Sequence, residues 1–496
     1  MNKAKKFVPV LTAVLVTAVA LCAMPKAVNA NAMSSGFGYR KGVTASGAVV
    51  IGENCPVEIK SEVLTFNVPD LIDHSSTKEQ LLNYRADFSA EYTLKNPDES
   101  VVTATLAFPM GRRSTYGYYE KDDPQDGTDE WRESYVHLDD VFADRYKVLV
   151  EGEEIQTQLR HTYHINDEDF VAESKRLYDE YRPHEFFNSE MPVYKYKFII
   201  NSKEEESFTA KVTVNYPDGV RFAGTYGHID FNSDKAVITY YAREAGEEID
   251  LYSIGGQLDC NSLEWRFYRG SLSKPKDVEA KAELVPEIEI TTFENYVFEG
   301  YTGGNGVSKC DFYNAVLDYI DHNSKSTVLP DSSTEMLSAD YEALEGSSRL
   351  MGWLIYEVEL DAGQTVKNTV TAPLFPGFYN YYKPTVYNYE FAFSSAQNLN
   401  GLESFEIRVN TPYYVLNSNF KFEKTEYGYC YKANELPQES LIFEVCTVED
   451  PVNNGNNLGV ALAAVFVVII AIPTALCLGF AIWGIVVLVK GEKSKF

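Results

Sequence analysis

Positive charge is scarce in this 496-residue chain. It holds 44 Lys and Arg against 72 Asp and Glu, a formal net charge of −28 at pH 7. A chain this negative repels phosphate backbones, so we expect no nucleic-acid partner. The sequence also lacks any Asn-x-Ser/Thr acceptor, which argues against an N-glycosylated eukaryotic ectodomain. Apolar residues still make up 45% of the chain, which excludes disorder throughout.

Sequence motifs of catalysis are missing as well. The chain has no Gly-x-Ser-x-Gly elbow, no phosphate-binding glycine loop and no His-Glu-x-x-His pair, each of which carries a specific chemistry. His161 and His164 have His-x-x-His spacing, but three residues along a strand place two side chains on opposite faces. We therefore predict no enzyme activity, no catalytic residues and no cofactor-binding residues.

The first thirty residues have the three parts of a secretory signal. Lysines near the start are followed by an apolar stretch over 7–24 and then by Val28-Asn29-Ala30. The first and last of these three residues are small enough for a signal-peptidase site. We predict a signal peptide over 1–30, cleaved near Ala30.

A second apolar run covers residues 459–489 and contains no charge. At about 1.5 Å per residue it is longer than the ~30 Å hydrocarbon core of a bilayer, so we predict a transmembrane helix. Lysines follow it in the tail 490–496. A segment rich in Lys or Arg next to a membrane-spanning helix usually stays in the cytoplasm. The large segment should therefore lie outside the cell in a single-pass, type I arrangement. Few cysteines and no glycosylation sites favour the cell membrane of a Gram-positive bacterium.

Five cysteines lie outside these two segments. Cys430 and Cys446 occur in two strand-like runs separated by a turn-rich stretch at 433–437, so we predict a disulfide between them. Such a bridge would stabilise the fold by roughly 3 kcal/mol. Cys55, Cys260 and Cys310 must leave at least one thiol unpaired. The alternative is that all five are buried thiols.

Alternation of apolar and polar residues predicts a mainly β protein. The runs are expected to pair as hairpins: 84–95 with 102–108, 146–150 with the run from 155, and 194–200 with 208–216. Helical spacing is confined to 170–181 and 312–320, and Ser332 with Glu335 has the form of a capping box.

The expected fold is two β-sandwich-like extracellular domains with a few short helices and one C-terminal transmembrane helix. After the signal peptide we expect an N-terminal β-sandwich domain over 31–255, a mixed α+β segment over 256–349, a C-terminal β-sandwich domain over 350–452, a linker over 453–458, the transmembrane helix and the cytoplasmic tail.

The first half of the chain resembles the vault/inter-alpha-trypsin (VIT) sandwich over about residues 84–216. The turn Asn96-Pro97, the strand end Phe108-Pro109, a hairpin and a helix follow one another in that order. The resemblance implies a β-sandwich and no particular activity. The sequence departs from the family in an acidic insertion at 111–140, and the usual von Willebrand A partner is missing. The whole chain also resembles uncharacterised single-span surface proteins of Gram-positive bacteria.

An acidic loop at 122–133 is the candidate metal site. Asp122, Asp126, Glu130 and Glu133 fall at positions 1, 5, 9 and 12 of an EF-hand loop. Pro124 stands where a further ligand is needed, and no flanking helices are evident. A solvated acidic loop is the alternative. We therefore expect no resident cofactor, with calcium at this loop as the competing hypothesis.

Tyrosine is abundant, with 35 residues, and gathers between Phe378 and Tyr389. Exposed tyrosine is favoured at binding surfaces because it brings contact area and a hydroxyl group. The alternative is that this stretch forms the core and rim of a sandwich. The sequence predicts a membrane-anchored, non-catalytic surface module that binds an extracellular protein or glycan. A calcium-dependent adhesin is the alternative, and an extracellular hydrolase is less favoured.

Overall fold

The computed structural model describes residues 44–453, apart from gaps at 46–48, 52–54, 73–75, 113–114, 122–130, 138–142, 165–169, 204–206, 216–218, 225–226, 233–234, 243–245, 271–273, 300, 302–305, 324–349, 380, 393–400 and 438–439. This part is mainly β, with several antiparallel sheets and a few short helices, as the alternation predicts. None of its helices is long and apolar enough to cross a membrane. The predicted signal peptide and transmembrane run lie outside the described residues.

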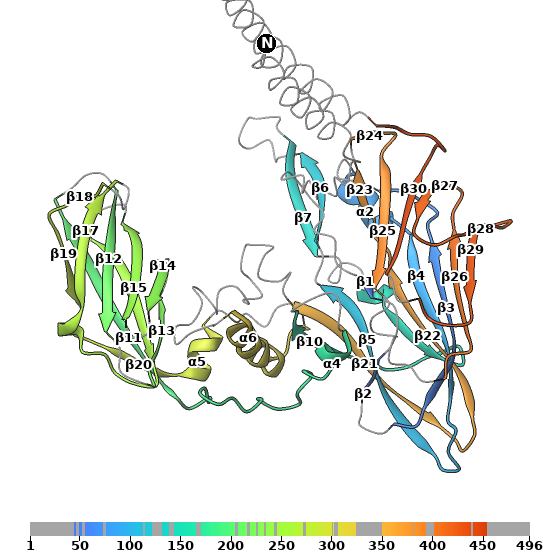
Figure 1. Cartoon of the computed structure of the whole chain (residues 1–496), viewed down its shortest axis with the longest axis horizontal. Helices are drawn as coiled ribbons and strands as arrows, with labels where there is room; N and C mark the ends of the chain where they lie inside the picture. Colours follow the sequence, from blue (N-terminus) through green and yellow to red (C-terminus); the bar gives the residue numbers. More distant parts are fainter. Residues whose placement is uncertain are drawn as a thin grey trace, which may run out of the picture.

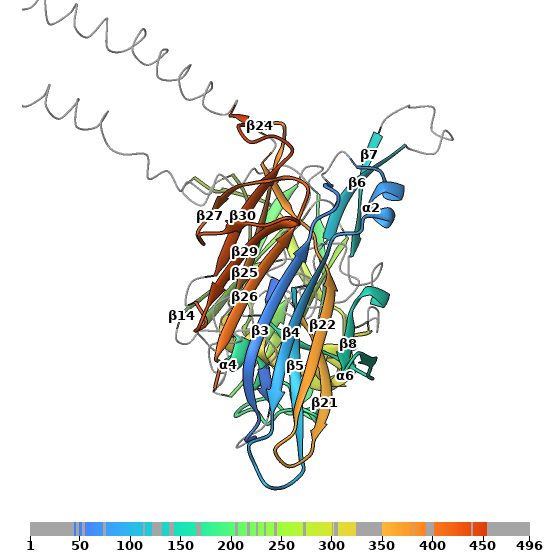
Figure 2. The ribbon, with the colours of Figure 1, turned by 90° about the vertical axis from the view of Figure 1, so that its right-hand side faces the viewer.

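A large β-sandwich is built from both ends of the described chain (Figure 1). Its main sheet has eight strands in the order β28-β29-β26-β3-β4-β22-β8-β9, and β26 with β3 is its parallel pair. Figure 2 shows β26, β3, β4 and β22 side by side. The bounds are β28 Glu423–Lys424, β29 Gly428–Ala433, β26 Ser404–Asn410, β3 Glu58–Asn67, β4 Asp87–Lys95, β22 Thr365–Pro373, β8 Lys147–Val150 and β9 Glu153–Glu154.

Two smaller sheets face the main sheet. One has the order β10-β21-β5-β2; the other has the order β1-β25-β30-β27, with β23 also paired to β25. Two short pairs, β24 with β31 and β6 with β7, complete this body. The bounds are β10 Gln158–Tyr163, β21 Leu350–Leu360, β5 Val102–Arg112, β2 Val49–Ile51, β1 Thr44–Ala45, β25 Val386–Ala392, β30 Leu441–Cys446, β27 Tyr414–Ser418, β23 Gly377–Tyr379, β24 Tyr382–Lys383, β31 Val452–Asn453, β6 Thr115–Lys121 and β7 Trp131–His137.

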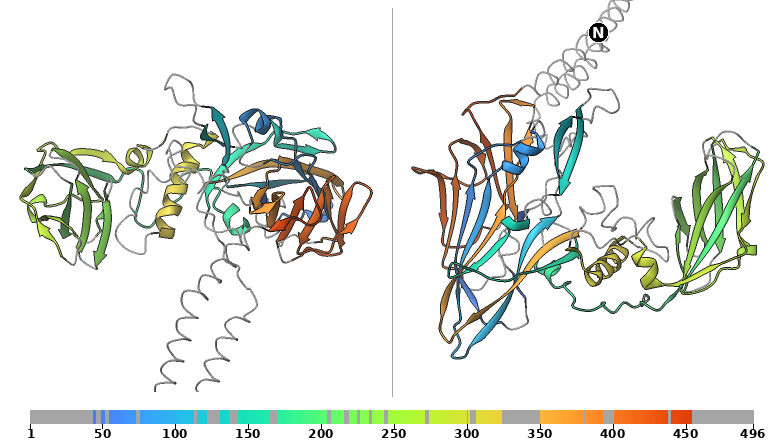
Figure 3. Two further views of the ribbon diagram at one scale, coloured as in Figure 1. Left: turned by 90° about the horizontal axis from the view of Figure 1, so that it is seen from above. Right: turned by 180° about the vertical axis from the view of Figure 1, so that it is seen from behind.

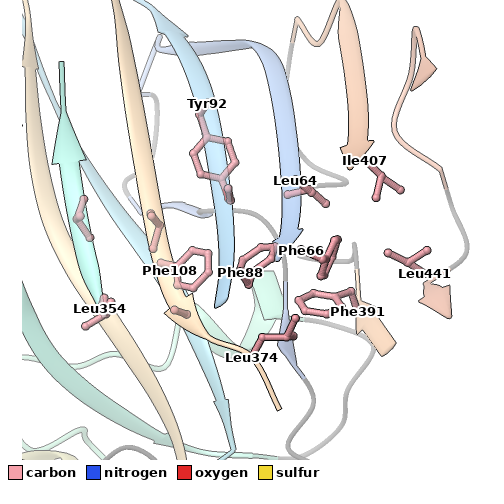
Figure 4. Packing of buried hydrophobic residues seen from close by; sticks show 14 of the residues in the cluster. Leu64, Phe66, Phe88, Tyr92, Phe108, Leu354, Leu374, Phe391, Ile407 and Leu441 are labelled. Atoms are coloured by element: carbon pink, nitrogen blue, oxygen red, sulfur yellow. The ribbon is translucent and has the colours of Figure 1, made fainter. Parts of the chain in front are cut away.

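Aromatic rings from the main sheet and the facing sheets meet in one core (Figure 4). Phe66 on β3 lies with its ring centroid 4.3 Å from that of Phe391 on β25 and 5.3 Å from that of Phe443 on β30. Phe88 on β4 lies 4.9 Å from Phe391. The N-terminal and C-terminal strands therefore share one hydrophobic core, and this pairing differs from the predicted linear division into separate sandwiches over 31–255 and 350–452.

The consecutive strands β4 and β5 belong to opposite sheets of this sandwich. β4 pairs with β3 and β22, whereas β5 pairs with β21 and β2, so the predicted hairpin of 84–95 with 102–108 is wrong. Alternation shows which side of a strand is buried. The same alternation is found whether two consecutive strands pair as a hairpin or belong to facing sheets, so it cannot distinguish these two arrangements. The hairpin predicted after residue 146 is confirmed in short form by β8 and β9.

Buried Asn96 ties two of these crossing connections together. Its Nδ2 donates to the carbonyl oxygens of Ser100, Leu360 and Asp361 at 2.7, 3.1 and 3.0 Å. Its Oδ1 accepts from the backbone N–H of Asp98 at 3.0 Å. The side chain thus joins the β4–β5 turn to the β21–β22 turn, and no aliphatic side chain can make these bonds.

Replacing Asn96 by alanine should lower the free energy of unfolding by about 2–3 kcal/mol, because the substitution removes one buried and three partly buried hydrogen bonds and leaves their backbone partners without this side chain. Urea denaturation of the full chain in detergent measures the change. Glu99→Ala, in the same turn but exposed, is the matched control and should change stability by less than about 0.5 kcal/mol. Equal losses in the two variants would contradict the proposed role of Asn96.

A second β-sandwich is inserted between β10 and β21 of the first (Figure 3). One sheet has the order β13-β16-β11-β19, with β20 also paired to β11, and the other has the order β14-β15-β12-β17-β18. The bounds are β11 Pro192–Ser202, β12 Phe208–Asn215, β13 Arg221–Gly224, β14 Gly227–Asn232, β15 Lys235–Ala242, β16 Glu247–Ile254, β17 Glu264–Arg269, β18 Lys276–Asp277, β19 Ala280–Leu284 and β20 Glu289–Thr292.

The insertion corrects two expectations. β11 pairs with β16 and β12 pairs with β15, so the predicted hairpin of 194–200 with 208–216 is wrong: its two strands lie in the two facing sheets. The segment 84–216, which resembles a single VIT sandwich, is divided between the two bodies. Its strands up to Tyr163 belong to the first sandwich, and those from Pro192 belong to the second.

Short helices lie between the two sandwiches (Figure 3). α4 (Phe170–Ser174) is shorter than the helix predicted over 170–181, whereas α6 (Lys309–Asn323) confirms the helix predicted around 312–320. α5 (Phe293–Phe298) and α6 pack in one cluster with residues of β10, β16 and β21. The remaining short helices are α2 Lys78–Asn83, η2 Ala143–Arg145 and η3 Cys260–Ser262. The predicted capping box at Ser332 lies outside the described residues.

Candidate binding surface and buried ionic network

The tyrosine-rich stretch divides between core and surface. Tyr387 and Tyr389 on β25 are buried in the large core, as the core alternative predicted for this stretch. Tyr379 instead ends β23 of the same sheet, Tyr382 begins β24, and Tyr381 lies between these strands with 43% of its surface exposed. The ring centroid of Tyr381 is 5.5 Å from that of Tyr379 and 4.9 Å from that of Tyr382. These three rings form a continuous aromatic surface.

A row of polar side chains crosses the outer face of the sheet beside these rings. Asn388 on β25 is opposite Glu444 on β30, which is opposite Asn417 on β27. Gly377 on β23 is the next partner of Asn388, and a Cβ there would collide with the amide oxygen of Asn388. The absence of a side chain at Gly377 therefore leaves room for this amide in its present position. We call the three tyrosines, Asn388, Asn417, Glu390 and Glu444 the tyrosine face.

Carboxylates act electrostatically on the rings. Burial is the main cause that raises the pKa of Tyr379, and Glu444 and Glu390 raise it further. Burial also raises the pKa of Tyr381, to which its tyrosine neighbours and Glu444 add. Burial raises the pKa of Glu444 itself, against a hydrogen bond from Asn417 that lowers it. The tyrosine face therefore combines aromatic area, amide groups and negative potential, which suits recognition better than acid–base chemistry.

The sequence analysis found the rings but missed their polar neighbours. Alternation within 386–392 and 441–446 places Asn388, Glu390 and Glu444 on the side opposite the buried residues, so a signal was present. What the sequence could not show is that β23, β25, β30 and β27 are neighbours.

A buried ionic network joins the large sandwich to α6. The Arg160 guanidinium on β10 donates through Nε to Asp311 at 3.0 Å and through a terminal nitrogen to Asp179 at 3.0 Å. Asp311, at the start of α6, also accepts from the backbone N–H of His161 at 2.9 Å. Burial raises the pKa of Asp311, and Arg160 opposes that rise. No sequence pattern indicated this pair, because its members are 151 residues apart.

The network continues through His164 and Glu173. His164 Nδ1 lies 3.0 Å from Glu173 Oε2, and Arg176 lies 3.6 Å from the same carboxylate. Arg176 and Arg182 both approach Asp318 on α6, at 3.7 and 3.2 Å. Burial raises the pKa of Asp318 to about 6, against the two arginines. The arrangement positions α6 against β10 and α4 through charge pairs.

The described residues contain no group of three or more His, Cys, Asp or Glu side chains that could hold a metal ion. Of the calcium candidates, Asp122, Asp126 and Glu130 lie outside the described residues. Glu133 lies on β7, where its backbone is paired with Tyr119. The calcium hypothesis stays a prediction.

The predicted disulfide is not formed in the structure, where Cys430 and Cys446 are both free thiols. Cys430 lies on β29 of the main sheet, with its Sγ 3.3 Å from a carboxylate oxygen of Glu406. Cys446 lies on β30 of a facing sheet, with its Sγ 3.5 Å from the carbonyl oxygen of Thr385. The two strand-like runs that carry these cysteines belong to different sheets. Cys55, Cys260 and Cys310 are also free.

Comparisons with known proteins identify no family for this chain and only distant structural similarity. No family model matches the chain, so the VIT resemblance gains no support there, and no curated protein matches it. Three chains of solved structures match. One is a crystal structure of a Legionella pneumophila protein to which nutrient binding is provisionally ascribed. It is 8% identical, the match covers 82% of this chain and 72% of that one, and the TM-score is 0.26. A likeness this distant carries no argument about function.

Proposed function

We propose that this chain is a membrane-anchored bacterial cell-surface protein whose described part is a non-catalytic binding module. The observation that carries the proposal is the tyrosine face, where three neighbouring rings lie beside amides and carboxylates on an outer sheet face. Aromatic side chains with polar neighbours are typical of recognition surfaces. The chargeless run at 459–489 supports anchoring, and the lysines after it support a large domain outside a Gram-positive cell.

The position of the tyrosines favours binding over a purely structural role. Tyr387 and Tyr389 show how this sandwich uses tyrosine in its core, with both rings turned inward. Tyr381 lies on the outer side and keeps 43% of its surface exposed, although it is held between two other rings. Aromatic side chains that are already held in a fixed arrangement at the surface lose little conformational entropy when a ligand binds.

We expect the full chain in detergent to gain thermal stability from at least one of two probes, N-acetylglucosamine and choline. A ligand that binds only the folded state raises the apparent melting temperature by mass action. The double variant Tyr381→Ala, Tyr382→Ala should lose that response. Tyr241→Ala removes a 71% exposed tyrosine on β15 of the other sandwich and should keep it. No response from the wild type, or an unchanged response in the double variant, would refute the tyrosine face as a binding site.

A further inference from the structure

We propose that the tyrosine face binds its ligand through a positively charged ammonium group. This inference rests on the proposed binding function and specifies the chemistry that the face recognises. It follows from the rings, the carboxylates beside them and the positions of the protein's own cations.

The rings provide a surface that attracts cations. The face of an aromatic ring carries negative charge density and attracts an ammonium group within about 6 Å of its centroid. The ring of Tyr381 lies 5.5 Å from that of Tyr379 and 4.9 Å from that of Tyr382. A cation seated on exposed Tyr381 would therefore be close to more than one ring.

The carboxylates favour a ligand with a positive charge. Glu444 is opposite Asn388, and Asn388 is opposite Gly377, two residues before Tyr379 on β23. This register places the Glu444 carboxyl group on the same face of the sheet as Tyr379, and Glu444 contributes to raising the pKa of both Tyr379 and Tyr381. Glu444 is half-buried, and its described interaction is the hydrogen bond from the neutral amide of Asn417. A bound cation would compensate this charge, an anion would be repelled, and a neutral ligand would leave it uncompensated.

Elsewhere in the described part, Lys and Arg side chains of the protein make cation–π contacts with aromatic rings. Lys195 lies over Tyr252, Arg221 over Phe186, Arg266 over Tyr268 and Lys309 over Phe298. Among the described contacts none places a Lys or Arg over Tyr379, Tyr381 or Tyr382. Lys383, the next residue, is exposed on β24, which pairs with β31. In the described part of the chain the protein thus places no cation on these rings, and Tyr381 keeps 43% of its surface exposed.

The test compares choline with 3,3-dimethylbutan-1-ol, which has the same shape but no charge. Binding to the full chain in detergent is measured by isothermal titration calorimetry, with propylammonium as a second cation. We expect choline or propylammonium to bind at least about fivefold more tightly than the neutral analogue, the ratio that one cation–π contact of about 1 kcal/mol provides. Tyr381→Ala and Glu444→Gln should each weaken cation binding by a similar factor, and Tyr241→Ala should not.

The outcomes separate this inference from the function on which it rests. Equal binding of choline and its neutral analogue, lost in Tyr381→Ala, would overturn the ammonium inference and leave the binding function standing. No binding of any probe that depends on Tyr381 would overturn both. A preference for choline would assign a quaternary headgroup as the source of the ammonium group, and a preference for propylammonium would assign a primary amine; either preference supports the inference.

Discussion

Replacing Glu62 by glutamine should make the protein more stable at pH 7, by on the order of 3 kcal/mol, and should flatten the dependence of its stability on pH. Glu62 lies on β3 with its side chain fully buried in the core of the large sandwich. Its strand partners are Tyr92 on β4 and Phe405 on β26, both buried. Neither carboxyl oxygen has a hydrogen-bond partner in the described structure.

The sign of the effect follows from the pKa. Burial raises the pKa of Glu62 from 4.5 to about 8, whereas the unfolded chain keeps the ordinary value. Between these two values the folded protein holds a proton that the unfolded chain has released. The free energy of unfolding therefore falls as pH rises, by at most about 1.4 kcal/mol per pH unit. This loss is absent below the unfolded pKa and complete above pH 8.

Urea denaturation at pH 4.5, 6, 7 and 8 measures this effect in the wild type and in Glu62→Gln. The curves should be close at pH 4.5 and diverge steadily above it. Glu62→Met should show the same flattening with additional stability at every pH, because it buries an apolar chain of similar length. Glu58→Gln, on the same strand but half-buried, is the control and should follow the wild type. Parallel curves for the wild type and Glu62→Gln would show that Glu62 is not a buried neutral acid.

The second large effect is expected at Arg160. Arg160→Met should lower the free energy of unfolding by about 3–5 kcal/mol, because it leaves the buried carboxylate of Asp311 without its cation. Arg160 bonds the carboxylates of Asp311 and Asp179 and the carbonyl oxygen of Tyr178. The same substitution thus removes a link between β10 and α6.

A double-mutant cycle tests this assignment. Arg160→Met with Asp311→Leu should recover more than half of the loss, because no buried charge then remains unpaired. Trp353 is a suitable fluorescent reporter, since it is opposite Arg160 in the sheet and its indole N–H donates to Thr162 at 2.8 Å. Arg408→Met breaks a surface pair with Glu406 and should cost less than about 1 kcal/mol. Additive effects of the two buried substitutions would contradict the proposed coupling.

The local faces of many strands were predictable. In β4 the alternation assigned Phe88, Ala90, Tyr92 and Leu94 to one side, and all four are fully buried. The helix around 312–320 followed equally well from its spacing. Both features depend on the periodicity of a short segment, which every part of the chain carries by itself.

Glu62 shows where such periodicity fails. The register of β3 against β4 shifts between Ile59 and Ser61, and a β-bulge of this kind changes which residues face the core. Ile59 therefore points inward together with Glu62 and Leu64. Alternation counted forward from Ile59 through the bulge assigns Glu62 to the outer side, whereas alternation counted back from Leu64 assigns it to the core. The pattern of this strand alone therefore did not decide on which side Glu62 lies.

The sequence by itself determined the β class, the inward faces of regular strands, the position of α6 and the gathering of tyrosines near residue 380. The tertiary structure alone decided which strands are neighbours, and with them the shared core of both chain ends, the free state of Cys430 and Cys446, the Arg160–Asp311 pair and the carboxylates of the tyrosine face. The physical reason is that a strand's pattern records only that one side is buried. The partner that buries it is chosen by the summed packing of segments hundreds of residues apart, as in β5 and β21.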